Sequence, residues 1–181
     1  MRNHSESPLP LDILCYAISP ENGLPAIIHV QLGDVHLLYQ KTKDMKAVNI
    51  TLTFNGQAEA AFNFYKSVFG GEFIHMQRLK EMPSPHPLSE EEGEKILHVA
   101  LPVGSQVLAG MDIPAGRPQS NPGDNFMITL DNESEEETLK FYEALSDGGF
   151  VMMPLEHQFW GAYFGMLTDK FGIQWMLSYV K

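Results

Sequence analysis

Hydrophobic and polar positions form short, well-defined patterns from Asn49 onward. Apolar and polar residues alternate with a period of two at 50–54, which predicts a strand followed by a turn at Asn55-Gly56. Residues 57–69 carry apolar side chains at three-and-four spacing, which predicts a helix with one buried face. Gly70-Gly71 is expected to end this helix, because glycine accepts the left-handed conformation used at helix C-termini.

Further strand and helix patterns follow, separated by turn residues. After a strand at 73–79 and a loop rich in Pro and Glu, residues 96–103 and 106–111 predict a hairpin around Gly104-Ser105. Ser134-Glu-Glu-Glu137 is a capping-box start to a helix that runs to about Leu145, before Gly148-Gly149. The remaining predicted strands are 126–130, 150–155, 163–168 and 174–180.

The two halves of this region repeat each other in residues as well as in order. The matching residues are Phe64-Tyr65, Gly70-Gly71 and Phe73 in the first half, and Phe141-Tyr142, Gly148-Gly149 and Phe150 in the second. The repeat predicts an α+β fold in which a βαβββ module is duplicated, over about 49–112 and 125–180. A helix covers only one face of such a sheet, so the other face is expected to close against the partner sheet around a ligand-sized concavity.

Residues 1–44 carry a weaker pattern and are interpreted as an N-terminal extension ahead of a domain at 45–181. Within the extension, residues 26–40 predict two short strands that turn at Gly33-Asp34. Met45 directly precedes the sharper pattern. The extension is therefore either a genuine part of the protein or the result of a start codon set too early.

The formal net charge of −11 argues against binding to nucleic acid or to anionic membranes, because both need a basic surface. The acidic runs Glu90–Glu94 and Glu133–Glu137 are interpreted as a solvated loop and a helix start, in preference to cation sites. No apolar run approaches the roughly 20 residues of a membrane-spanning helix. Cys15 is the only cysteine, which excludes an internal disulfide and favours the reducing cytoplasm.

Several segments carry a resemblance to a known family. They are Phe54-Asn-Gly-Gln-Ala-Glu59, Phe64-Tyr-Lys-Ser-Val-Phe-Gly-Gly71, Ile96-Leu-His98, Pro154-Leu-Glu156, Phe159-Trp-Gly161, Phe164-Gly165 and Asp169-Lys-Phe-Gly-Ile-Gln-Trp175. In these segments the chain resembles the PhnB-like branch of the vicinal oxygen chelate superfamily, which includes glyoxalase, bleomycin-resistance proteins and extradiol dioxygenases. The resemblance implies paired βαβββ modules, usually in a homodimer. Members are often labelled by similarity to a demethylubiquinone methyltransferase, but no glycine-rich loop for a methyl donor is visible here.

The resemblance also implies where a metal ion would be held. A glyoxalase-type enzyme uses a divalent metal bound by His, Gln and Glu side chains on strands of both modules. The matching positions here are Thr51 or Thr53, Thr129 and Met176. Neutral hydroxyls and a thioether are poor ligands for such a metal. We therefore expect no metal and no other cofactor.

The candidate ligand-binding residues are His98, Asp112, His157, Phe159, Trp160 and Tyr163. A structural role is the favoured alternative for His98, and core packing is favoured for the aromatic segment 159–163. Glu156 and His157 are adjacent on a strand, so at most one of them faces the ligand. Asp169 is expected to cap the final turn.

The leading hypothesis for function is a small-molecule-binding protein of the PhnB-like type, with no residue assigned a catalytic role. The alternative is a metal-dependent lyase, isomerase or dioxygenase with an atypical ligand set such as His98, Asp112 and His157. A third interpretation is an interaction module whose N-terminal strands pair with a partner. The pattern identifies neither the ligand nor the pathway.

Overall fold

The computed structural model describes residues 13–18, 25–30, 49–83 and 87–181. The chain divides into two units, Met1–Val48 and Asn49–Lys181. The first unit contains an antiparallel hairpin of β1 (Ile13–Ile18) and β2 (Pro25–Val30). Residues 26–30 thus form a strand, as predicted. This strand pairs with β1, which precedes it, whereas the pattern predicted pairing with a strand after Gly33-Asp34. The turn predicted at Gly33-Asp34 lies outside the described residues.

The described part of the second unit contains two four-stranded sheets with the same strand order. The order is β3-β6-β5-β4 in the first sheet and β7-β10-β9-β8 in the second. In each sheet the first and last strands of the module pair in parallel, and the other pairs are antiparallel. This identity of topology confirms the predicted duplication of a βαβββ module. The strands are β3 (Ile50–Phe54), β4 (His75–Arg78), β5 (Ile96–Val103), β6 (Gln106–Asp112), β7 (Ile128–Asp131), β8 (Phe150–His157), β9 (Ala162–Thr168) and β10 (Gln174–Val180).

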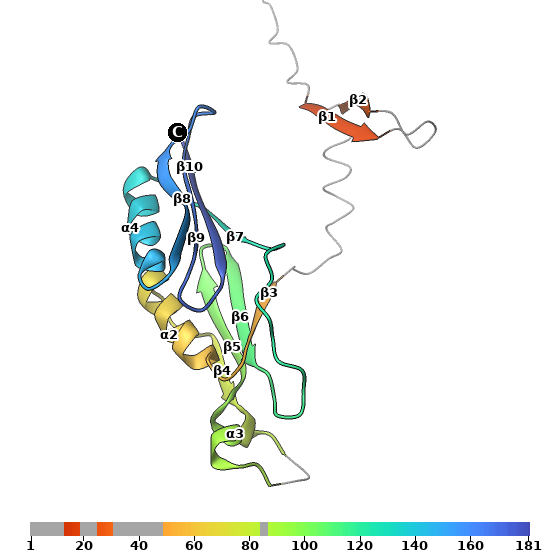
Figure 1. The fold of residues 1–181 in the computed structure, drawn as a ribbon, viewed down its shortest axis with the longest axis vertical. Coiled ribbons are helices and arrows are strands. Elements are labelled where there is room, and N and C mark those ends of the chain that lie inside the picture. Colours follow the sequence, from red (N-terminus) through yellow and green to blue (C-terminus); the bar gives the residue numbers. More distant parts are fainter. Residues whose placement is uncertain (1–12, 19–24, 31–48, 84–86) are drawn as a thin grey trace, which may run out of the picture. The chain divides into compact units, whose positions relative to one another are not determined.

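The helices α2 (Ala58–Phe69) and α4 (Glu135–Ser146) lie on the same side of the sheets (Figure 1). Their apolar faces join one core that spans both modules. Tyr65 of α2 packs against Trp175 of β10 with ring centroids 5.5 Å apart, and Phe69 packs against Phe141 of α4 at 5.4 Å. In the described part of the chain, no helix is long and apolar enough to cross a membrane.

The local signals at the helix ends are largely confirmed. The Ser134 hydroxyl accepts a hydrogen bond from the Glu137 amide, as a capping residue does. The Glu137 carboxylate accepts from the Glu133 amide, so the reciprocal bond of the capping box falls one residue early. Gly70 ends α2 with a φ of 78°, in the left-handed region.

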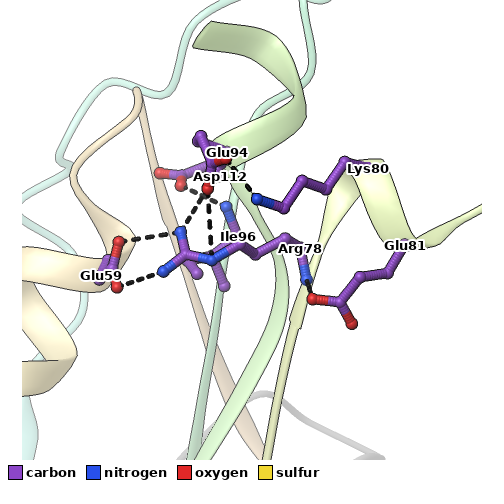
Figure 2. A network of polar contacts seen from close by, with 7 residues as sticks. All are labelled: Glu59, Arg78, Lys80, Glu81, Glu94, Ile96 and Asp112. Atoms are coloured by element: carbon purple, nitrogen blue, oxygen red, sulfur yellow. Dashed lines mark hydrogen bonds and ion pairs between the residues drawn. The ribbon is translucent and has the colours of Figure 1, made fainter. Parts of the chain in front are cut away.

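The acidic segment that the sequence predicted as a loop contains helical turns. They are η1 (Leu79–Glu81) and α3 (Glu90–Glu94), and the Ser89 side chain caps α3. Arg78 ties this segment to α2, because its guanidinium donates to both carboxylate oxygens of Glu59 and to the Glu94 carbonyl (Figure 2). Lys80 pairs with the Glu94 carboxylate. These cations offset the charge of Glu94, and the Ser89 cap satisfies an amide at the start of the short helix.

Candidate functional site

The face of the two sheets away from α2 and α4 is here called the open face. Burial along β3 defines it, because Leu52 and Phe54 are buried toward the helices whereas Thr51 and Thr53 are exposed. Strand register extends the assignment to the neighbouring strands. The open face carries Thr51, Thr53, His75, Gln77, His98, Ala100, Ala109, Met111, Thr129, Phe164, Met166, Thr168, Gln174, Met176 and Ser178.

The open face differs from the predicted closed concavity. Thr51, Thr53 and Thr129 are exposed, and Met166 and Met176 are only half-buried. The physical reason is the way the modules associate. Aromatic contacts between them, such as Tyr65 with Trp175 and Phe69 with Phe141, lie on the helix side. That side therefore forms the core and the other stays accessible.

A hollow of about 190 Å³ lies where the two modules meet. Thr51 and Thr53 of β3 form one wall, and Gln174 at the start of β10 forms another. Apolar contributions come from Phe126, Phe171 and Ile173. Among the described residues that line it there is no ionisable side chain. The hollow therefore offers hydroxyl and amide groups beside apolar surface, without a charge.

The segment between the modules, residues 113–127, builds part of this hollow. Ser120 is fixed to the first module by Asn55, whose amide donates to the Ser120 carbonyl and whose amide oxygen accepts from the Ser120 N–H, both at 2.9 Å. The Ser120 and Thr53 hydroxyls are also 2.9 Å apart. These bonds hold the segment against β3. The sequence indicated only a turn at Asn55, and residues 113–125 fell between the predicted strands at 106–111 and 126–130.

Two of the positions at which the resemblance places a metal, Thr129 and Met176, lie together, but their side chains do not fit a metal ion. Thr129 and Met176 are cross-strand partners, with the Thr129 hydroxyl 3.8 Å from the Met176 sulfur. Met166 is the partner of Met176 on the other side. Neutral hydroxyls and thioethers supply neither the charge nor the imidazole that a catalytic divalent ion needs.

Of the predicted site residues, His98 lies on the open face of the first sheet and Asp112 faces the helices. Asp112 is buried, and its carboxylate accepts hydrogen bonds from three amides. One oxygen accepts from the Gly56 and Ala58 N–H groups, and the other accepts from the Ile96 N–H, all at 2.9 Å. This carboxylate therefore fixes the start of α2 to the start of β5.

His157 and Tyr163 lie together at one end of the second sheet. Their rings are 4.9 Å apart, and Nε2 of His157 is 3.7 Å from a Glu135 carboxylate oxygen in α4. Glu156 is instead the partner of Phe164, whose side chain belongs to the open face. Hence the structure does not bring His98, Asp112 and His157 together. In the residues it describes, no group of three His, Cys, Asp or Glu side chains could hold a metal ion.

Phe159 and Trp160 occupy the connection between β8 and β9. Their exposed fractions are 97% and 51%, so core packing, the alternative favoured for them from sequence, is wrong. Trp160 packs edge-on against Phe164 with ring centroids 5.9 Å apart. Because Phe164 belongs to the open face, Trp160 extends the apolar surface of that face.

Asp169 caps its turn as predicted, accepting from the Phe171 and Ile173 amides. Its other carboxylate oxygen accepts from the Trp175 indole at 2.9 Å and from the Tyr65 hydroxyl at 2.8 Å. Burial, and then the Asp169 charge, raise the pKa of Tyr65 far above its ordinary value. Tyr65 therefore stays protonated as the donor. The sequence placed Tyr65 on a buried stripe, but gave no signal for this partner.

Comparison with known proteins agrees with the fold. The family model for the glyoxalase/bleomycin resistance protein/dioxygenase superfamily matches residues 47–177. Protein YjdN of Escherichia coli is 30% identical over 139 residues, covering 72% of this chain and 92% of that protein. The crystal structure of PA1353 from Pseudomonas aeruginosa has a TM-score of 0.65 and 35% identity, covering 74% of this chain and 98% of its own. The PhnB protein from Bacillus cereus has a TM-score of 0.61 and 26% identity, covering 75% and 100%.

Proposed function

The chain belongs to the glyoxalase/bleomycin resistance protein/dioxygenase superfamily, and we propose that it acts within it as a PhnB-like small-molecule-binding protein. One observation carries this proposal. The hollow between the modules is lined from three parts of the chain, by residues that offer hydrogen bonds and apolar contact but no ionisable group. Such a lining suits binding, whereas acid–base chemistry needs a titratable side chain within reach of the ligand.

The same lining restricts the chemistry of the ligand. The Thr51 and Thr53 hydroxyls and the Gln174 amide can donate and accept hydrogen bonds, so they favour an uncharged polar group. A charged group would lose hydration there without gaining a partner of opposite charge. The apolar remainder of the ligand would extend along the open face, where Met166 and Met176 provide adaptable thioether surface. Of the predicted residues, Trp160 extends the apolar surface of the open face through its contact with Phe164.

We also propose that the protein is a homodimer in the cytoplasm. The open face and the adjoining edge strand β8 leave large apolar side chains accessible, with Phe150 69% exposed and Met152 42% exposed. Large apolar side chains that are exposed next to one another on a domain surface favour a protein partner. A second copy would supply the closed concavity that the single chain lacks. Size-exclusion chromatography with light scattering tests this assembly.

The binding proposal is tested by a fragment screen monitored by amide NMR. Uncharged aromatic amides should shift the amide resonances of β3, of residues 120–126 and of the start of β10. Gln174→Ala should weaken the best fragment about tenfold, because the half-buried side-chain amide that lines the hollow and can hydrogen-bond the fragment is lost. Ser178→Ala is the matched control, since Ser178 is also on the open face of β10 but outside the hollow. Fragments that bind elsewhere, or that bind Gln174→Ala as tightly as wild type, would contradict the proposal.

A further inference from the structure

Two histidines lie side by side on the open face of the first sheet. His75 of β4 is paired with Ala100 of β5, and Gln77 is paired with His98, so the two imidazoles are diagonal neighbours across adjacent strands. Their ring centroids are 5.6 Å apart and their planes are inclined by 41°. His75 is exposed and His98 is half-buried, so solvent reaches the pair.

We propose that His75 and His98 form an exchangeable binding site for a divalent transition-metal ion of the nickel, copper and zinc group. Metal–nitrogen bonds of about 2.1 Å place the centroids of two imidazoles on a tetrahedral ion about 5 Å apart. The observed 5.6 Å is therefore close to the separation that a shared ion requires. Small side-chain rotations at solvent-accessible positions are enough to close the difference.

The ring nitrogens of this pair are available to a ligand. Among the residues that the structure describes, His157 makes a side-chain polar contact, with Glu135, whereas His75 and His98 make none. Imidazole is a good ligand for nickel, copper and zinc, and a weak one for magnesium and calcium. Gln77, directly opposite His98, places an amide oxygen on the same face as a third donor. A site with two imidazoles leaves positions for water or for a small-molecule donor.

This site is separate from the positions at which the family resemblance places a metal. Those positions are on β3, β7 and β10, where the side chains are Thr and Met, whereas His75 and His98 are on β4 and β5. Two imidazoles hold a metal less tightly than the three protein ligands of a catalytic site. The ion would therefore exchange with the solution and not remain as a resident cofactor. The inference does not rest on the proposed binding function of the hollow.

The test uses the full chain, freed of metal with a chelator and titrated with Zn²⁺ at about pH 7.5, where imidazole is neutral. Imidazole-nitrogen NMR resolves each histidine separately, which matters because the sequence also contains His4, His29, His36, His86 and His157. Saturable shifts of His75 and His98 at the same Zn²⁺ concentration are expected. His75→Asn and His98→Asn should each weaken binding at the pair at least tenfold.

His157→Asn is the matched control, because His157 lies in the other sheet beside Glu135. This variant should leave the His75 and His98 titration unchanged. The inference would be overturned if Zn²⁺ failed to shift the resonances of either His75 or His98 in the wild-type protein. This outcome does not depend on whether the variants fold. Independent titrations, with affinity at one histidine unaltered by replacing the other, would overturn it as well. Neither result bears on fragment binding in the hollow.

Discussion

The Tyr65 hydroxyl donates a 2.8 Å hydrogen bond to Oδ2 of Asp169, a residue 104 positions further along the chain. Tyr65 belongs to the helix of the first module and Asp169 to the turn between the last strands of the second. The same carboxylate also accepts from the Trp175 indole and from two turn amides. A single buried acid thus orders the final turn and joins the modules on their helix side.

Tyr65→Phe should therefore lower the free energy of unfolding by about 1.5–3 kcal/mol, the range for a hydrogen bond to a charged group. Tyr142→Phe is a matched control, because the Tyr142 hydroxyl donates to the neutral carbonyl of Met153 within the second module. We expect about 1 kcal/mol there. Urea denaturation of both variants measures the difference. Equal losses would show that the Asp169 charge adds nothing to the junction.

Trp160→Ala should have a small effect on stability. A tryptophan in a core would cost about 3–5 kcal/mol when truncated. Trp160 is 51% exposed, so we expect a loss of no more than about 1 kcal/mol by urea denaturation. Leu167→Ala, at a fully buried position, is the contrasting variant and should lose about 2–5 kcal/mol. If Trp160→Ala lowered the free energy of unfolding by about 3–5 kcal/mol, Trp160 would be buried in solution.

The acidic helix α3 should be held in place less well in acid. Lys80 lowers the pKa of Glu94, and Lys95, followed by the Ala115 amide, lowers that of Glu92. A carboxyl whose pKa is lower in the folded state stabilises it above the unfolded pKa, and this contribution is lost as pH falls through the folded value. The protein should thus lose stability below about pH 4.5.

Urea midpoints at about pH 6.5 and about pH 3.5 measure this dependence. Glu94→Gln should be less stable than wild type at the higher pH and should approach it at the lower one. Glu91→Gln is the control, because Glu91 is an exposed residue of the same helix. A stability gap between wild type and Glu94→Gln that is the same at both pH values would contradict the assignment.

Protein purified without a nickel column should contain well under one transition-metal ion per chain after dialysis. Thr51, Thr53, Thr129 and Met176 cannot retain a catalytic ion, and the His75–His98 pair exchanges what it binds. No glyoxalase activity is expected when nickel, zinc, iron or manganese is supplied. Elemental analysis and an activity assay check both statements. A retained, equimolar metal that His98→Ala removes would refute the metal-free prediction.

A chain that begins at Met45 should fold cooperatively and keep the oligomeric state of the full chain. The described contacts divide the protein between Val48 and Asn49, and both modules lie within the second unit. Thermal unfolding and size-exclusion chromatography of the two chains provide the comparison. Insolubility or a change in oligomeric state would mean that the first residues belong to the folded core.

The sequence by itself determined the element order and most of the buried faces. Local rules were enough for this part. The period-two pattern at 50–54, the helical stripe at 57–69 and the cap at Ser134 each depend on neighbours within a few residues. The repeat of these signals then predicted the duplicated module. The short helix α3 was missed because Lys80 and Arg78, which offset its charge, approach it from outside its own segment.

Only the tertiary structure decided which residues meet. Asp112 and His98 were both candidates in the sequence. The alternation of side chains along the strands places Asp112 toward the helices and His98 on the open face. The His75–His98 pair depends on the register of β4 against β5, and a shift of one residue would separate the rings onto opposite faces. Register and module association arise from long-range packing, which no local pattern encodes. The sequence therefore determined the modules, and the packing of those modules determined the site.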